Sequence, residues 1–301
     1  MPLTADPPAV SPEAATPMPK AWPAEPPLTL IDGRSHWTRA DLRELWAFRE
    51  LLYFLTLRDI KLRYKQTILG VGWSVLQPVA TMAVFVLFLG RVGGMAEGVD
   101  NYALFVLAGL IPWTFFSSAV TNAGNSLIGN ERLVTKTYFP RLLLPAANVA
   151  AAAFDCLVCT ALLVLVVVVG SAFGGPPPTW RLALLPAMAA AVGLTAFGFG
   201  TLLSALIATQ RDFRYLLNFG MQLWLFATVC IYRRPDLIGQ TAQLWLPFNP
   251  AYGLILNFRS AALGLPFDWY ALFVSGAVGA LVLGFALIYF RRVQQNLADT
   301  I

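Results

Sequence analysis

The sequence predicts an all-α integral membrane protein in which an amphipathic interfacial helix precedes six transmembrane helices, with a re-entrant helical pair between spans five and six. Two observations support this class. Apolar residues make up 57% of the 301 residues and charged residues 12%, whereas soluble domains carry about 25% charged residues. The apolar residues also form runs long enough to cross roughly 30 Å of hydrocarbon. A soluble globular protein is therefore excluded.

Residues 1–37 are predicted to be a disordered cytoplasmic extension. Residues 1–30 contain nine of the 21 prolines and no periodic apolar pattern. Such a segment cannot bury enough surface to offset its loss of conformational entropy. It also lacks the basic start and the apolar centre of a signal peptide.

An amphipathic helix is expected over residues 38–66. Arg58, Lys61 and Lys65 are spaced so that they share one helical face, and an apolar face with the same spacing begins at Leu57. A helix of this kind lies in the membrane interface; a soluble helix packed on a partner protein is the alternative. The basic residues attract anionic headgroups at about 1 kcal/mol each, although the usual cytoplasmic excess of positive charge explains them equally well.

Six spans are expected in the remaining part of the chain, residues 67–301. The predicted spans are 71–91, 103–126, 142–169, 181–208, 215–232 and 269–290. Sixteen of the 21 Lys and Arg residues fall in the N-terminal region, in the loops after spans two and four, and in the tail. Because Lys and Arg are concentrated on the cytoplasmic side, both termini are predicted to be cytoplasmic.

Residues 233–268 contain two apolar pieces, 237–246 and 252–263, which are too short to span a membrane. Pro247-Phe-Asn-Pro250 separates them. Irregular backbone at membrane depth is tolerated only where it is buried in protein or lines a water-filled cavity. We therefore expect a re-entrant helical pair; an ordinary external loop is the alternative.

Polar side chains recur at helical spacing in spans two and five. The candidates for lining a hydrophilic channel, together with nearby aromatic residues, are Trp113, Ser117, Thr121, Asn125, Asn218, Gln222 and Trp224. Hydroxyl and amide groups beside aromatic rings suit sugars, but helix packing explains the same pattern. Asp155, near the middle of span three, is expected to face the bundle interior or water, because a central aspartate costs about 2.5–3.5 kcal/mol. The sequence does not identify its partner.

Several other chemistries receive no support from the sequence. The phosphate-binding pattern G-x-x-x-x-G-K-[ST] is missing, so ATP is not expected to bind this chain in that manner. The single histidine leaves no His-rich metal site. Cys156 and Cys159 form a C-x-x-C inside an apolar run, where two ordinary buried thiols are expected.

Three motifs and the tail resemble type-2 ATP-binding-cassette permeases that export polysaccharides. The first motif is met by Arg58, Asp59, Arg63, Tyr64, Leu69, Gly70, Trp73 and Pro78. The other matches are residues 130–141 followed by Leu144-Pro145, residues 246–253 followed by Phe258-Arg259, and the tail, residues 289–301. The chain departs from the family pattern at residues 227–234, where two prolines are missing and two arginines are added.

The resemblance implies that residues 67–301 form a six-span type-2 transmembrane domain in the bacterial inner membrane. The chain would be a transport permease rather than an enzyme. It would pair with a second copy of itself and with two cytoplasmic ATPase subunits, which bind ATP and Mg²⁺, and it would need no cofactor of its own. The implied substrate is a lipid-linked glycan within membrane lipid, with O-antigen as the first choice; teichoic acid, capsule, drug or lipid are alternatives. No nucleic acid is involved.

The resemblance also assigns three groups of residues. The substrate portal would be formed by Arg58, Lys61, Arg63, Tyr64, Leu69, Gly70 and Trp73. The segment that couples to the ATPase would use Asn130, Glu131, Lys136, Tyr138, Phe139 and Arg141. The external gate would include Tyr232, Trp245, Pro247, Asn249 and Pro250. Functions of other classes remain open: a membrane-embedded enzyme acting on polyprenyl-linked sugars, for which no acidic or His cluster stands out, and a non-transporting scaffold.

Overall fold

The computed structural model describes residues 39–65, 67–92, 101–173, 177–228 and 244–300. All of them belong to one compact unit, residues 35–301. Every regular element within the described ranges is a helix, which confirms the all-α class. The predicted disordered extension, residues 1–37, lies outside the described residues.

Five helical stretches are long and apolar enough to cross a membrane, and they overlap five of the six predicted spans. They are α3 (Gly72–Phe85) with the π-helical η1 (Val86–Val92), α4 (Tyr102–Gly124), α7 (Leu143–Ser171), η2 (Trp180–Leu184) with α8 (Leu185–Thr209), and α12 (Trp269–Thr300). At the fifth predicted span, α9 (Phe213–Ala227) has 15 residues. That length gives about 22 Å of helix, and residues 229–243 lie outside the described part, so the count of six spans stays a prediction.

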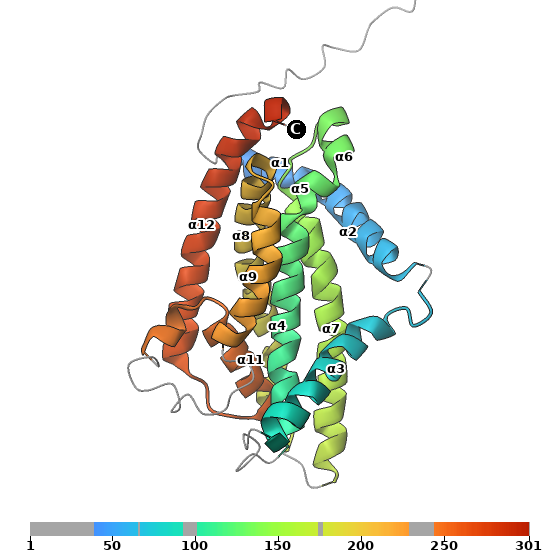
Figure 1. Ribbon diagram of the computed structural model, residues 1–301, viewed down its shortest axis with the longest axis vertical. Coiled ribbons are helices and arrows are strands. Elements are labelled where there is room, and N and C mark those ends of the chain that lie inside the picture. The colour runs from blue at the N-terminus through green and yellow to red at the C-terminus, as the bar shows by residue number, and fades with distance from the viewer. Residues whose placement is uncertain (1–38, 66, 93–100, 174–176, 229–243, 301) are drawn as a thin grey trace, which may run out of the picture. The chain divides into compact units, whose positions relative to one another are not determined.

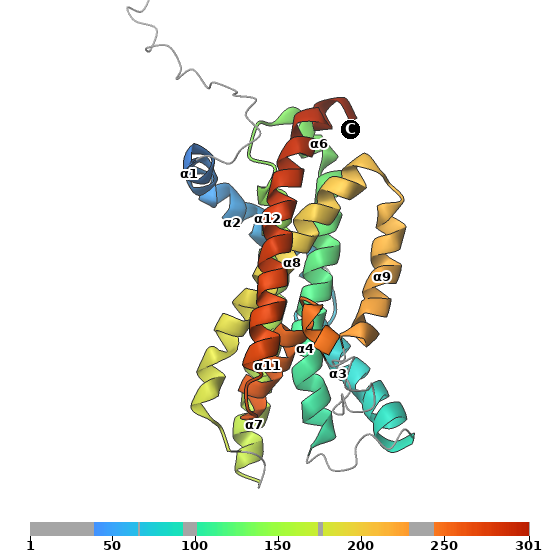
Figure 2. The same ribbon diagram turned by 90° about the vertical axis from the view of Figure 1, so that its left-hand side faces the viewer.

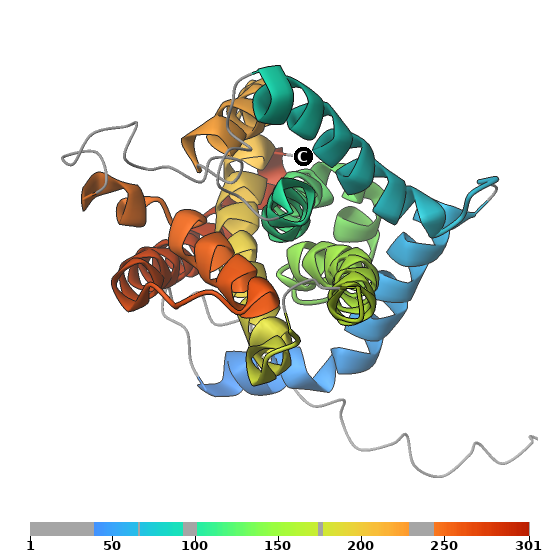
Figure 3. The same cartoon turned by 90° about the horizontal axis from the view of Figure 1, so that it is seen from below.

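Helix α4 is the centre of the bundle, with α3, α7 and α8 around it (Figure 3). Of its membrane-crossing window, 72% is buried, against 6% for α3. Small residues permit the close packing: a Cβ added at Gly200 of α8 would lie 2.5 Å from the Ala123 Cβ of α4, and one at Gly198 would lie 2.9 Å from the Leu283 Cα of α12. Small residues at helix interfaces allow the backbones of membrane helices to approach each other closely.

The predicted helix 38–66 is divided into α1 (Arg39–Ala47) and α2 (Arg49–Tyr64). The division falls at Phe48, whose side chain packs against a core cluster that includes Leu55 of α2. In Figure 1, α2 starts in the upper part of the bundle, toward the end that carries α6 (Glu131–Lys136), and runs obliquely down the outside of the bundle, so that its end lies at mid-height. The end of the bundle that carries α6 and the C-terminal part of α12 is called the α6 end below.

The opposite end contains η4 (Leu246–Phe248) and α11 (Tyr252–Leu263) (Figures 1 and 2). Helix α11 is largely buried against α4, α8 and α12. Its last turn ends at Gly264, which has φ +71°, and Arg181 Nη1 donates a hydrogen bond to the Gly264 carbonyl oxygen at 3.0 Å. The other apolar piece of the predicted re-entrant pair, 237–246, falls mostly outside the described residues, so the pair itself stays a prediction.

Candidate functional site

A cavity of about 680 Å³ lies where the turn between α2 and α3 faces helices α4 and α7. We call it the elbow cavity. Its polar wall combines hydroxyl and amide groups from α3 and α4, namely Gln77, Thr81, Ser117, Ser118, Thr121 and Asn122. The indole rings of Trp73 and Trp113 complete the lining. Hydroxyls, amides and aromatic faces together can bind a carbohydrate.

Asp155 of α7 is held in this cavity by the last turn of α2. Arg63 Nη1 donates to one carboxylate oxygen of Asp155, and the Tyr64 hydroxyl donates to the other. Asp155 lies about 18 Å along α7 from its first residue, a depth at which an unpaired charge is costly. The ion pair therefore gives Asp155 the partner that the sequence did not identify.

Tyr64 acts as a hydrogen-bond donor in this cluster over the whole physiological pH range. Partial burial and the neighbouring Asp155 carboxylate raise the pKa of Tyr64 to about 12. The phenol thus keeps its proton at neutral pH, and α2 contributes both a cation and a neutral donor to one carboxylate.

The turn from α2 to α3 is open and uses a glycine with a left-handed backbone. Gly70 has φ +52°, a conformation that costs other residues about 1–2 kcal/mol. A Cβ added at Gly70 would meet nothing within 4 Å. Leu69 is exposed, and Trp73 is half exposed while it lines the cavity. Of the residues predicted for a portal, Arg63, Tyr64 and Trp73 line the elbow cavity, whereas Leu69 and Gly70 belong to the turn beside it.

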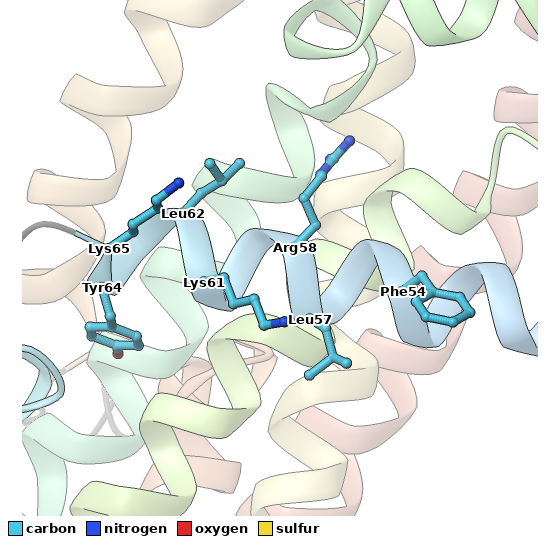
Figure 4. Close-up of a pocket in the computed structure, with 7 residues that line it drawn as sticks. All are labelled: Phe54, Leu57, Arg58, Lys61, Leu62, Tyr64 and Lys65. Carbon is cyan, nitrogen blue, oxygen red and sulfur yellow. The ribbon is translucent and has the colours of Figure 1, made fainter.

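A second hollow, of about 720 Å³, runs along α2 itself (Figure 4). We call it the α2 groove. It is lined by the apolar side chains of Phe54, Leu57 and Leu62, by the ring of Tyr64, and by the basic residues Arg58, Lys61 and Lys65. The three basic residues thus line one surface, as their spacing predicts. Apolar side chains with cationic heads beside them suit the boundary between acyl chains and headgroups.

Arg58 connects α2 to the segment after span two. Its guanidinium Nη2 donates to Asp59 Oδ1 at 2.8 Å and to Asn130 Oδ1 at 3.0 Å. The Asn130 amide in turn donates to the Ser126 carbonyl oxygen in α5 (Ser126–Gly129) at 2.9 Å. The predicted portal and the predicted coupling segment are therefore in direct contact, 72 residues apart in sequence.

The predicted coupling segment, residues 130–141, presents two kinds of side chain. Glu131, Lys136 and Tyr138 are exposed at the α6 end. Phe139 is only 4% exposed and packs in the core. Arg141 Nη1 donates to the Gln294 carbonyl oxygen of α12 at 2.9 Å, and burial lowers the pKa of its guanidinium. Three of the six predicted residues are thus accessible, and Phe139 and Arg141 face inward.

The predicted channel residues do not gather in one place. Trp113, Ser117 and Thr121 line the elbow cavity. The Asn125 amide donates to the Thr121 carbonyl oxygen of its own helix at 2.8 Å. Asn218 and Gln222 are exposed on α9, which lies at the edge of the bundle (Figure 2).

Trp224, the last of the predicted channel residues, instead belongs to an aromatic cluster. Its ring lies edge-on to Phe116, with centroids 5.2 Å apart, and to Phe199, with centroids 5.0 Å apart. Such pairs add about 0.5–1.5 kcal/mol beyond the area that they bury. The indole nitrogen donates to Asn249 Oδ1 at 2.9 Å. Trp224 therefore has a packing role in this structure.

The described part of the predicted external gate is held by two polar side chains. The Asn249 amide donates to Thr228 Oγ1 at 3.1 Å, which fastens η4 to the end of α9. The Ser275 hydroxyl of α12 lies 2.8 Å from the Pro247 carbonyl oxygen and accepts the Gly253 N–H at 2.9 Å. We call residues 246–253 the external segment.

The remaining gate residues differ in their surroundings. Trp245 is exposed and Pro250 is buried, while Tyr232 lies outside the described residues. Within the ranges that the structure describes, His, Cys, Asp and Glu side chains form no group of three that could hold a metal ion.

Sequence reasoning missed Ser126 and Ser275 as partners of the candidate site, and it singled out Asp59 and Asp155 without identifying their partners. Asp155 carried a signal, since a carboxylate at membrane depth requires a partner. Ser275 carried none, because a small polar residue in a span commonly bonds its own helix.

Comparisons with a protein family and with individual proteins indicate the same kind of transporter. The ABC-2 type transporter family matches residues 50–263. The O-antigen export system permease protein RfbA of Myxococcus xanthus is 30% identical over 263 residues, which cover 86% of this chain and 98% of the relative. A protein of the same name from Klebsiella pneumoniae is 27% identical over 250 residues, covering 83% of this chain and 94% of the relative. This chain belongs to the ABC-2 type transporter family and is a multi-pass transport permease.

Proposed function

We propose that this chain is the transmembrane subunit of an ATP-driven exporter that moves a lipid-linked O-antigen polysaccharide across the bacterial inner membrane. The relatives from Myxococcus xanthus and Klebsiella pneumoniae are both O-antigen export permeases, and the alignments cover 98% and 94% of their lengths. The observation that carries the proposal is the elbow cavity with its carbohydrate-compatible lining, joined to a basic groove that suits a lipid headgroup.

The path of the substrate follows from these two surfaces. The lipid part lies along the α2 groove, where Lys61 and Lys65 attract its negative charge. The glycan passes the turn at Gly70 and enters the elbow cavity, whose hydroxyl and amide groups replace the hydrogen bonds of water. It leaves near the external segment, where Tyr232, Trp245, Pro247, Asn249 and Pro250 form the gate.

Energy is supplied by two cytoplasmic ATPase subunits, because this chain lacks their phosphate-binding pattern. They dock on the exposed side chains of Glu131, Lys136 and Tyr138 at the α6 end. Both chain termini are then cytoplasmic, in agreement with the distribution of Lys and Arg. A movement of the ATPase subunits would be transmitted to α2 through the hydrogen bond between Arg58 and Asn130.

A second copy of the chain completes the channel. Helix α9 exposes a face that mixes Asn218 and Gln222 with large apolar side chains. A lipid-facing surface would not need those amides, which favours a protein partner for this face. The channel therefore runs between two copies, with the polar residues of α9 facing it.

Deletion of the gene in its own organism tests this function. The expected result is loss of O-antigen from the cell surface and accumulation of a lipid-linked glycan in the cytoplasmic leaflet, both restored by the wild-type gene. Surface polysaccharide that is unchanged, or a lipid-linked glycan that does not accumulate, would reject the proposal. Accumulation of a different lipid-linked polymer would keep the exporter and correct its substrate.

A further inference from the structure

The cluster of Arg63, Tyr64 and Asp155 has the composition of an occupied anion site. Two donors from the end of α2 converge on one carboxylate from α7. The cluster is not sealed: the side chains of Arg63 and Asp155 are 29% and 19% exposed, and all three residues line the elbow cavity. A molecule in that cavity would reach the same two donors.

The position of Tyr64 joins this site to the lipid surface. Tyr64 is the residue that lines both the α2 groove and the elbow cavity. A lipid headgroup at this end of the groove therefore reaches Tyr64 and the neighbouring Arg63. Figure 4 shows the Tyr64 ring at the end of the row of basic and apolar side chains that forms the groove.

A carboxylate and a phosphate present the same type of acceptor to these donors. Guanidinium groups bind both anions through parallel N–H···O hydrogen bonds, and phosphate oxygens accept from a phenol as carboxylate oxygens do. An Arg left without an anion at this depth would carry a large desolvation cost. The exchange of one anion for another avoids that cost for Arg63, while the displaced Asp155 carboxylate loses its two donors.

We propose that Arg63 and Tyr64 form a binding site for the phosphate group of a lipid-linked glycan, and that Asp155 occupies this site as an internal anion while the cavity is empty. The inference rests on the proposed function, because it assigns the part of the exported lipid that the portal recognises. The incoming phosphate must displace the carboxylate, and the two negative charges repel each other. Asp155 therefore weakens binding and makes it reversible.

Binding to the full-length chain in phosphatidylcholine nanodiscs tests the proposal, with polyprenyl phosphate, the phosphate-free polyprenol and inorganic phosphate as probes. Asp155→Asn removes the competing charge while it keeps the size of the side chain. We expect it to bind polyprenyl phosphate about tenfold more tightly than the wild type, as removal of one like charge at short range implies. Polyprenol binding should not change.

The gain must depend on Arg63. In the double variant Asp155→Asn with Arg63→Gln, polyprenyl phosphate should bind more weakly than it binds to the wild type. An unchanged affinity in Asp155→Asn, or a gain that persists without Arg63, would overturn the proposal. Inorganic phosphate should not compete at equal concentration; equal competition would mean that the site recognises free phosphate, and the assignment to a lipid would be wrong.

Two further variants separate this effect from others. Asp212→Asn changes the net charge by the same amount at an exposed turn that lines neither hollow, so an equal gain in that variant would also overturn the proposal. If Asp155→Asn does not fold, Tyr64→Phe retains the ion pair and removes one donor, and it should lower the affinity for polyprenyl phosphate about fivefold. If the wild type exports O-antigen while these affinities do not change, the inference fails and the proposed function stands.

Discussion

The turn between α2 and α3, called the elbow below, and the external segment are both irregular connections beside the membrane-crossing helices, yet they are built in opposite ways. The elbow is held at its end by an ion pair, and a Cβ added at Gly70 would meet open space. The external segment is held by buried hydrogen bonds to backbone groups, and a Cβ added at Gly253 would lie 2.0 Å from the Ala271 carbonyl oxygen. The elbow is therefore fastened by a partly exposed ion pair with open space beside it, whereas the external segment is fixed by tight packing.

The largest effect is expected where packing is tightest. Gly253→Ala would place a methyl group against the Ala271 carbonyl oxygen of α12, and we expect a loss of about 3 kcal/mol in the free energy of unfolding. Thermal unfolding of the purified protein in detergent measures it. Gly276→Ala on α12 is the matched control, because a Cβ there meets nothing within 4 Å. Equal unfolding temperatures for the two variants would contradict the claim that the external segment is held by tight packing.

A smaller loss is expected when the hydrogen bonds of the external segment are removed. Asn249→Ala leaves the Trp224 indole N–H and the Thr228 hydroxyl without this partner, which should cost about 2 kcal/mol. The same unfolding measurement applies, with Asn218→Ala at an exposed position of α9 as the control. A destabilisation no greater than that of the control would show that the bond contributes little.

A substitution of Gly70 in the elbow is expected to strain the backbone without causing a steric clash. Gly70→Ala keeps open space around the methyl group but disfavours the backbone at φ +52°, so the cost should be about 1 kcal/mol. Export should slow, and lipid-linked glycan should accumulate in the cytoplasmic leaflet of cells. Gly72→Ala is the matched control, since it begins α3 and makes only an ordinary contact at 3.7 Å. Normal export by Gly70→Ala would show that the shape of the turn is not required.

The smallest effect on stability is expected on the exposed face of the coupling segment. Lys136→Glu should change the free energy of unfolding by less than about 0.5 kcal/mol and still abolish export, because it reverses a charge at the surface proposed to bind the ATPase. Export assays and membrane fractionation measure the two properties. Arg141→Glu should instead destabilise the chain, because Arg141 binds the Gln294 carbonyl oxygen. Unimpaired export by Lys136→Glu would remove that residue from the proposed interface.

The sequence predicted what depends on local periodicity. The all-α class, five of the spans and the shared surface of Arg58, Lys61 and Lys65 all follow from apolar runs and helical spacing. A helix pattern fixes which residues share a face, but it does not identify the neighbour that covers this face.

The contacts that define the site could not be predicted, because they join residues that are distant in sequence. Arg63 and Asp155 are 92 residues apart. The same reason explains why Phe139 of the predicted coupling segment is buried, why Arg141 binds the Gln294 carbonyl oxygen of α12, and why Trp224 packs against Phe116 and Phe199. The division of the first predicted helix falls at Phe48, which packs against a core cluster whose members, apart from Leu55, are distant in sequence.

The two attachments of α2 make it a short lever. Arg58 holds it to Asn130, and Arg63 holds it to Asp155, about 7.5 Å further along the helix axis. The buried Leu55 seats the same helix on the core near the first attachment. Because an α-helix is stiff over this length, a displacement of Asn130 would move α2 as one body. The predicted coupling segment is thus connected to the wall of the elbow cavity through a single helix that packs against α7.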